Sequence, residues 1–515
     1  MKPMLKSKRK RITWIIFPLV CLGAFLGSCA VTTVIRPTDE AAVSRFSWVN
    51  PAPELPYPPA MYRLTLEGTW SDMGLAYGRQ LGQHIAVVCE RVLDHWVEMA
   101  GGPEVTAKAF AHLKLDLAKA AWSIKAFAPE MIEFMDGLAQ GAAENLNLVR
   151  PDSGLSNVEK IQAINVAGWL TQNPGQHSAH DRTGQKFSSK SKTAVWPEQG
   201  VAFAAFGRST PAGHTIAGIS WDQLFDPYMF QVAIQVKPLD QNAAPYQGTV
   251  MVGCVGGNSL LSQRGLWIGQ TRAGSRLGSG REAQETSFGV NRLIAAAHVA
   301  AYAKSKKEAA EMLTYGTPGY TAMTGYKTLI LGEPANYLIA DDLSALVVER
   351  TAEAFAVRYP GVLDEKGDYI ICAGNFSMPY GYDVLGKKST NPMTMFSPTP
   401  DADPAGRYRS KAVIIWLTRP KILVTRTRAK EMVSIDYIME SHRIMAKTIE
   451  DPATGQKIPA TELGYTMSNQ VKNKAGQVFY GTVTGQVIDP AKRVIEYTLG
   501  PPSPWMGPWD RLDIS

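Results

Sequence analysis

The chain has 515 residues, of which 45% are hydrophobic and 19% are charged, a composition typical of a globular protein rather than a disordered one. Its length allows one large core or two modest ones. The formal net charge of +7 is misleading, because six of the 53 basic residues precede Cys29 and no acidic residue does. The remaining chain is close to neutral, so its charge does not indicate nucleic-acid binding.

The N-terminus joins this basic run to an apolar stretch at residues 12–28, which is a little short for a membrane span of about 20 residues. A basic segment, a short apolar segment and small residues before a cut site are typical of a secretory signal. Leu26-Gly27-Ser28-Cys29 also resembles a bacterial lipobox, in which Cys29 is lipidated and becomes the mature N-terminus. An uncleaved N-terminal anchor is the alternative. Both interpretations, the lipidated signal and the uncleaved anchor, predict a protein of the cell envelope that is attached to a membrane on its periplasmic or extracellular side.

The whole sequence predicts the following division of the chain. Residues 1–29 are expected to form the lipoprotein signal, 30–60 a Pro-rich tether, 61–170 a helical part, 171–199 a polar loop and 200–515 the core. The run NPAPELPYPP at residues 50–59 is typical of a stiff spacer.

The cysteines and motifs limit the chemistry. Beyond the signal, Cys89, Cys254 and Cys372 allow at most one disulfide and a free thiol, so a disulfide scaffold is excluded. The sequence contains no CxxC, HExxH, Walker loop or dinucleotide fingerprint. We therefore expect no metal or nucleotide cofactor.

Residues 70–170 have the apolar spacing of helices. Met73, Tyr77 and Leu81 recur at helical intervals behind Ser71, which is a candidate N-cap. A second helix is expected from Pro129, because proline is favoured in the first helical turn.

From residue 201 the pattern changes to short strands, VAFAAFG, HTIAGIS, MFQVAIQV, GTVMVGCV and GLWIGQT. Helices are expected again at residues 287–303 and after Ser305, which has Glu308 at capping-box spacing. Then follow the strands TLILG, NYLIAD, ALVVER, AFAVRY and DYIICAG, a helical block at 407–447 and a final hairpin that turns at Asp489-Pro490. Runs of strands between runs of helices predict an α+β fold with helices packed on antiparallel sheets.

Several stretches, taken in order, resemble a known family. The helix segments LEGTWSDMGLAYGRQL and PEMIEFMDGLAQGAA are similar to two of its helices, and FAAFGRSTPAGHTIAGISWD resembles its core hairpin. GLWIGQT, NYLIAD with ALVVER, and the last hairpin follow as later landmarks. The chain resembles the acyl-coenzyme A:6-aminopenicillanic acid acyltransferase-like hydrolases (peptidase family C45), which are related to the phospholipase B-like and choloylglycine hydrolase groups.

This resemblance implies an N-terminal-nucleophile (Ntn) hydrolase-like fold, an αββα four-layer sandwich with an N-terminal helical region. It also implies hydrolysis or acyl transfer at linear amide bonds of acylated small molecules. In such enzymes the precursor cuts itself before a Cys, whose new α-amino group acts as base to its own thiol. An Asp and one or two Asn residues orient the amine and stabilise the oxyanion.

The chain departs from the family pattern at its first position, because the nucleophile aligns with Gly200. The usual Arg-Asn pair falls on Ile219 and Ser220, whereas Asp222 is kept. The site Asn before the "G-L" strand falls on Ser262, and Asn375 lies near the other oxyanion position. Asp222 and Asn375 are therefore the candidate catalytic residues, although a strand-end Asp is as often a cap of backbone amides.

Cys254 and Cys372 are the possible substitute nucleophiles, but buried free cysteines are usually inert small hydrophobic residues. His214 and His298 have no acidic or cysteine partner nearby in the sequence. Two functions follow. One is an amidohydrolase or acyltransferase with impaired or altered catalysis. The other is a pseudoenzyme that binds a small acylated amide, a lipid-like ligand or an envelope partner.

Overall fold

The computed structural model describes residues 62–170, 199–224, 231–272, 289–351, 355–360, 368–373, 478–499 and 509–515, together with short strand segments at 36–37, 380–382, 388–390, 448–450, 457–459 and 470–472. Within these residues no helix is long and apolar enough to cross a membrane. The expected signal, with Cys29, lies outside the described residues.

The helices form two groups along the chain. The first group follows strand β2 (Tyr62–Gly68) and consists of α3 (Trp70–Ala100), η1 (Pro103–Val105), α4 (Thr106–Phe127), α5 (Pro129–Gly141), α6 (Ala143–Leu146), η2 (Pro151–Ser153) and α7 (Asn157–Leu170). The second group consists of α10 (Arg292–Tyr302), α11 (Lys306–Tyr315) and α12 (Pro318–Thr324).

The larger sheet has 11 strands among the described residues, in the order β1-β2-β5-β6-β7-β8-β9-β10-β11-β13-β14. Its other strands are β1 (Arg36–Pro37), β5 (Gln231–Pro238), β6 (Tyr246–Met251), β7 (Ser259–Ser262), β8 (Trp267–Arg272), β9 (Ala335–Ala340), β10 (Ala345–Arg350), β11 (Phe355–Arg358), β13 (Tyr380–Tyr382) and β14 (Lys388–Thr390). The β2–β5 pair is parallel, and the other pairs of described strands in this sheet are antiparallel.

The smaller sheet has 7 described strands, with the order β12-β3-β4-β18-β19-β20 and β17 paired to β18. These strands are β12 (Tyr369–Ala373), β3 (Gln199–Ala205), β4 (Ile216–Leu224), β17 (Gln470–Lys472), β18 (Val478–Asp489), β19 (Val494–Leu499) and β20 (Asp510–Asp513). A separate two-stranded sheet pairs β15 (Thr448–Glu450) with β16 (Lys457–Pro459). The 3-10 turn η4 (Gly207–Ser209) begins the β3–β4 connection.

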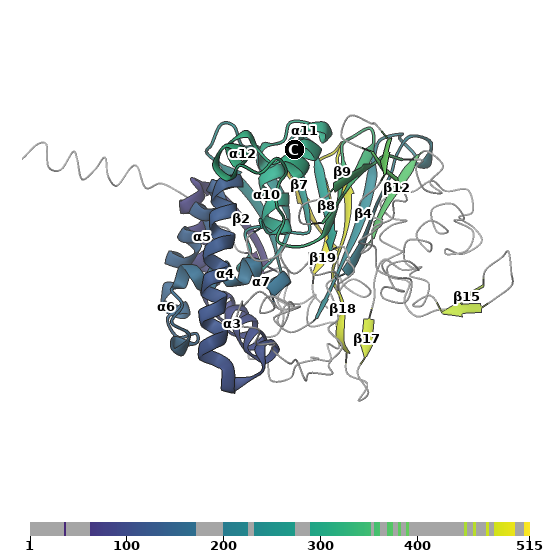
Figure 1. Cartoon of the computed structure of the whole chain (residues 1–515). Helices are drawn as coiled ribbons and strands as arrows, with labels where there is room; N and C mark the ends of the chain where they lie inside the picture. The colour runs from purple at the N-terminus through teal and green to yellow at the C-terminus, as the bar shows by residue number, and fades with distance from the viewer. Residues whose placement is uncertain are drawn as a thin grey trace, which may run out of the picture.

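The two larger sheets lie face to face, and the helices cover the other face of the larger one (Figure 1). The side-chain alternation of the strands produces this arrangement. On β9, Leu338 and Ala340 belong to the core between the sheets, whereas Tyr337 and Ile339 belong to the core under the helices. Ala202 and Ala204 of β3 also pack into the core between the sheets, where small side chains allow a close approach.

The expected α+β class is confirmed. The described residues form three layers, helices on a sheet on a second sheet. The expected fourth layer would come from the helical block at residues 407–447, which lies outside the described residues. The αββα four-layer sandwich therefore stays a prediction.

Three local expectations can be compared with the structure. Ser305 caps α11 by accepting the Glu308 N–H at 3.2 Å, as the capping-box spacing predicts. Ser71 as a cap is wrong, because α3 begins at Trp70 and the Thr69 hydroxyl accepts the Asp72 N–H. The strand expected at TLILG is also wrong, since only an isolated bridge at Leu331 forms there.

The two helix segments that carry the family resemblance, α3 and α5, pack against each other through glycines. A Cβ atom on Gly74 would lie 2.1 Å from the Phe134 carbonyl oxygen, and one on Gly137 would lie 2.1 Å from that of Ser71. These distances are far below any real Cβ contact, so each position accepts only glycine without a shift of the backbone. The glycines in both motifs are therefore needed for the close contact between α3 and α5.

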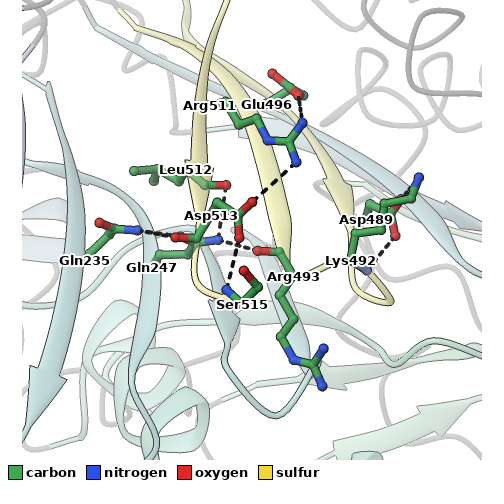
Figure 2. Close-up of polar contacts among 10 residues, drawn as sticks. All are labelled: Gln235, Gln247, Asp489, Lys492, Arg493, Glu496, Arg511, Leu512, Asp513 and Ser515. Atoms are coloured by element: carbon green, nitrogen blue, oxygen red, sulfur yellow. Dashed lines mark hydrogen bonds and ion pairs between the residues drawn. The ribbon is translucent and has the colours of Figure 1, made fainter.

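The end of the chain closes the smaller sheet and ties it to the larger one, as Figure 2 shows. The Gln235 Nε2 atom donates to the Asp513 carbonyl at 2.7 Å and to Gln247 Oε1 at 3.1 Å. The Gln247 Nε2 atom in turn donates to the carbonyls of Arg493 and Leu512. Two side-chain amides of the larger sheet thus hold the backbone of β19 and β20 in place.

Candidate functional site

The expected core hairpin is present as β3 and β4, and its register places Gly200 and Asp222 together. Gly200 pairs with Trp221, and Gln199 pairs with Asp222. Gly200 therefore occupies the start of β3, beside the end of β4 that carries the retained Asp. Since glycine has no side chain, this strand position offers no nucleophile.

The neighbouring strand on one side is β12, which leads toward Asn375. Cys372 pairs with Ala202, and Ala373, the last residue of β12, pairs with Val201. Asn375 follows two residues later in the sequence and lies outside the described residues. The described part of β12 thus runs toward the strand end of Gly200.

The neighbouring strand on the other side is β18, and it adds a hydroxyl to this end of the sheet. Thr484 pairs with Trp221 and Thr482 pairs with Asp222, with a register shift between them. The Thr484 side chain is 1% exposed, and its Oγ1 atom has no hydrogen-bond partner among the residues that the structure describes. An unsatisfied buried hydroxyl costs about 1–3 kcal/mol, so it is a candidate contact for a bound molecule.

The larger sheet presents a buried polar row to the same end of the smaller one. Thr271, Asn336 and Glu349 are paired in register across β8, β9 and β10. Glu349 forms an ion pair with Arg358, with Oε1 3.4 Å from Nε, and both side chains are 1% exposed. Arg358 also donates through Nη2 to the Ile371 carbonyl of β12, which links the row to the smaller sheet.

The cysteine thiols of the described residues are poor nucleophiles. The Cys372 Sγ atom lies 3.4 Å from Thr271 Oγ1, and burial raises the pKa of its thiol to about 12. Burial likewise raises the pKa of Cys254 to about 12. Both thiols stay protonated at neutral pH, and only the thiolate attacks.

The structure separates the two substitute candidates. Cys254 lies in the core under the helices, with its Sγ atom 3.9 Å from the Ile164 carbonyl oxygen. Cys372 lies in the core between the sheets, two pairing rows from Gly200. Only Cys372 is therefore placed at the end of the sandwich that holds Gly200.

Ser262 lies at the other end of the sandwich. It ends β7 and donates its N–H to the Leu266 carbonyl in the turn before β8, whereas Thr271 at the far end of β8 meets Cys372. The next residue in the turn, Gln263, accepts a hydrogen bond from Arg493 at the β18–β19 turn. Ser262, on which the site Asn of the family pattern falls, is therefore not brought to the Gly200 end, because the strand direction carries it away.

Both singled-out histidines have acidic partners that the sequence does not reveal, since those partners lie 275 and 168 residues away. His214 Nε2 lies 3.3 Å from Asp489 Oδ2, at the turn end of the hairpin. His298 Nδ1 lies 2.6 Å from Glu130 Oε1, between α10 and α5 in the helical layer. Neither histidine lies at the Gly200 end.

Sequence reasoning missed the polar residues that the fold adds to this end. A signal was present, because Glu349 and Arg358 are charged residues inside the otherwise apolar strands ALVVER and AFAVRY. A charge in a buried strand is rare unless it is paired. Thr271 and Thr484 carried no such signal, since threonine is common in strands.

Comparisons with known proteins give little further support. No protein-family model and no curated protein match the chain. Among solved structures, the chain is similar to two variants of conjugated bile acid hydrolase from Clostridium perfringens, at 11% and 12% identity and a TM-score of 0.34, over 61% of this chain and 92% of each of those. It is also similar to a Caenorhabditis elegans N-acylethanolamine-hydrolyzing acid amidase ortholog, at 11% identity and a TM-score of 0.33, over 61% of this chain and 100% of that one. Scores this low carry no argument, so the proposals below rest on the residues of this chain.

Proposed function

We propose that this chain is a nucleophile-deficient relative of the amide hydrolases that its motifs resemble. In this proposal it is held in the cell envelope by its N-terminus and binds a small acylated amide or lipid-like molecule. The observation that carries the proposal is the position of Gly200. It is the second residue of β3 and pairs with Trp221, next to Asp222, at the position where the family pattern has its catalytic Cys.

The surroundings of Gly200 favour binding over catalysis. The Thr484 hydroxyl is buried, has no partner in the described part of the chain and is suited to donate to an amide or ester carbonyl oxygen. The nearby thiol of Cys372 is held protonated by burial. Binding groups are therefore present at this end, and an activated nucleophile is not among the described residues.

Altered amide hydrolysis or acyl transfer is the second candidate, because Asp222 is retained beside the Gly200 position. Such a reaction needs a nucleophile from another residue. Cys372 is the candidate, since its backbone pairs with Ala202 on the strand of Gly200.

The first test measures binding and turnover with the full chain. A panel of N-acyl amides of increasing chain length is titrated calorimetrically and assayed for release of amine and acid. We expect saturable binding and no turnover. Hydrolysis by the unmodified chain that Cys372→Ala abolishes would support the second candidate and overturn the binding proposal.

The second test removes the unpaired hydroxyl. Thr484→Val keeps the side-chain shape, and we expect it to weaken binding about 5- to 10-fold, the value of one hydrogen bond. Thr314→Val is the matched control, because Thr314 is fully buried in α11 and its hydroxyl donates to the Ala310 carbonyl. Equal effects of the two variants on binding would argue against a ligand at Thr484.

The third test asks whether a thiol alone revives the site. We expect Gly200→Cys to leave the chain uncut after Gln199 and inactive, since an oxyanion hole is also required and one missing donor costs about 100- to 1,000-fold. Gly200→Cys with Ser220→Asn restores one more family position. Intact mass spectrometry reports cleavage, and two fragments from the unmodified chain would show that the assignment of Gly200 is misplaced.

A further inference from the structure

The outward face of α4 has an unusual composition for the surface of a soluble helix. Within this fully described helix the exposed residues are Ala107, Lys108, Ala111, Lys114, Leu115, Ala118, Lys119, Trp122 and Lys125. None of them is acidic. At 100° per residue, Ala111, Leu115, Ala118 and Trp122 form one stripe, and the lysines flank it on both sides.

The apolar stripe is well exposed, and the neighbouring helix α12 and the turn after it also expose apolar side chains. Leu115 and Trp122 are 61% and 43% exposed, Met323 near the end of α12 is 47% exposed, and Tyr326 just after this helix is 39% exposed. The two helices pack together, with the rings of Phe127 and Tyr320 6.2 Å apart. Both helices belong to the helical layer, on the side of the larger sheet away from the smaller one (Figure 1).

The charge of this face is positive. Lys108, Lys114, Lys119 and Lys125 are exposed on α4, and Lys327 is exposed just after α12. Two acidic groups reduce the charge: Asp116 pairs with Lys119 at 3.3 Å and Glu159 pairs with Lys114 at 3.5 Å. Glu104, in the 3-10 turn η1 just before α4, is an exposed acidic residue next to this face. Because both lysines of these pairs are about half exposed and such surface pairs are weak, their ammonium groups stay available to an anionic surface.

We propose that this face, defined as the exposed residues of α4 together with Met323, Tyr326 and Lys327, docks onto an anionic phospholipid surface. Trp122, Leu115 and Met323 enter the headgroup boundary, and the flanking lysines contact lipid phosphates. Interfacial helices combine lysine on the polar side with Trp and Leu on the apolar side. Trp and Tyr also favour the membrane–water interface.

The composition favours a lipid surface over a protein partner. Every basic side chain on the face is lysine, which is depleted at protein–protein interfaces, whereas arginine is enriched there. The lipid anchor expected at Cys29 is a separate N-terminal feature. Such an anchor would hold the chain near a membrane, where a basic apolar face would add a separate contact with anionic headgroups.

A spin-label experiment tests this proposal on the full chain. A nitroxide is attached to Leu115→Cys and, as the matched control, to Leu343→Cys, which is 71% exposed in the β9–β10 turn. Cys89, Cys254 and Cys372 are buried, and the unsubstituted chain gives the background from all other thiols. Each protein is reconstituted into vesicles of pure phosphatidylcholine and into vesicles that also contain phosphatidylglycerol.

We expect the label at position 115 to become protected from a water-soluble relaxation agent and accessible to oxygen only in the anionic vesicles. The label at position 343 stays in water in both. Replacing Lys125 or Lys327 with Gln lowers the ratio of protected to exposed label about fivefold for each charge. Lys307→Gln, at an exposed lysine of α11, leaves the ratio unchanged.

Equal water access at position 115 in both kinds of vesicle would overturn the proposal. So would protection that appears only when another protein is added, which would assign the face to a protein partner. Neither outcome depends on whether the Gly200 site binds a ligand.

Discussion

The Cys372 Sγ atom lies 3.4 Å from the Thr271 Oγ1 atom, and this contact joins the two sheets two pairing rows from Gly200. The thiol is 1% exposed, and burial raises its pKa to about 12. The same burial that places Cys372 near the candidate site therefore removes its reactivity. We therefore expect the Cys372 side chain to contribute to the contact between the sheets.

The buried thiols predict a loss of stability at alkaline pH. Cys89, Cys254 and Cys372 each have a pKa raised from 9.0 to about 12 by burial. The unfolded chain releases these protons near pH 9 while the folded chain keeps them, so rising pH favours unfolding. The contribution is complete below about pH 9 and is lost progressively between about pH 9 and pH 12. Urea unfolding at a series of pH values measures how the free energy of unfolding falls with pH. We expect replacement of all three cysteines with alanine to make this fall less steep. An equally steep slope without the thiols would assign it to other groups.

The α3–α5 contact predicts a strict need for glycine at Gly78. An added Cβ atom would lie 2.3 Å from the Leu138 carbonyl oxygen, so the two helices must move apart. We expect Gly78→Ala to lower the free energy of unfolding by about 1–3 kcal/mol, although alanine has the better helix propensity. Gly319→Ala in α12 is the control, because its nearest neighbour would be 3.9 Å away. Similar urea midpoints for Gly78→Ala and the unmodified chain would contradict the close packing.

The buried ion pair between Glu349 and Arg358 predicts a strong asymmetry between single and double replacement. Arg358→Met leaves a buried carboxylate without its partner, and we expect a loss of about 3–5 kcal/mol of stability. Glu349→Gln with Arg358→Met removes both charges, and we expect it to be more stable than Arg358→Met alone. Thermal unfolding of the two variants and of Glu349→Gln decides this. Additive losses in the double variant would show that the two groups do not act as a pair.

The N-terminal sequence predicts a processed lipoprotein. Cleavage before Cys29 and acylation of that residue would follow from the basic run, the apolar stretch and Leu26-Gly27-Ser28-Cys29. Mass spectrometry of the membrane fraction should find a diacylated Cys29 at the mature N-terminus, and Cys29→Ser should abolish the modification. An intact Met1 in that fraction would favour the uncleaved anchor instead.

Much of the local structure follows from the sequence pattern. The apolar spacing of α3, the Pro at the start of α5, the Ser305 cap and the Asp489-Pro490 turn all act within a few residues, and the structure contains each of these elements. The errors also have local causes. The Thr69 hydroxyl takes the cap expected for Ser71, and the apolar TLILG forms a single bridge because no strand lies alongside to pair with it in the described residues.

Some residues of the candidate site are also related by local sequence, whereas others are brought together only by the fold. Gly200 and Asp222 come together through one hairpin, whose register is local, so the sequence alone was enough to relate them. Thr484 and the Thr271–Asn336–Glu349 row come from strands far away in the chain. The pairing of β18 with β4 brings Thr484 to this end of the smaller sheet, and the packing of one sheet on the other brings the row. The same strand directions carry Ser262 to the opposite end. Local pattern specifies which strands form, whereas the burial of two apolar sheet faces against each other decides which of their polar residues meet.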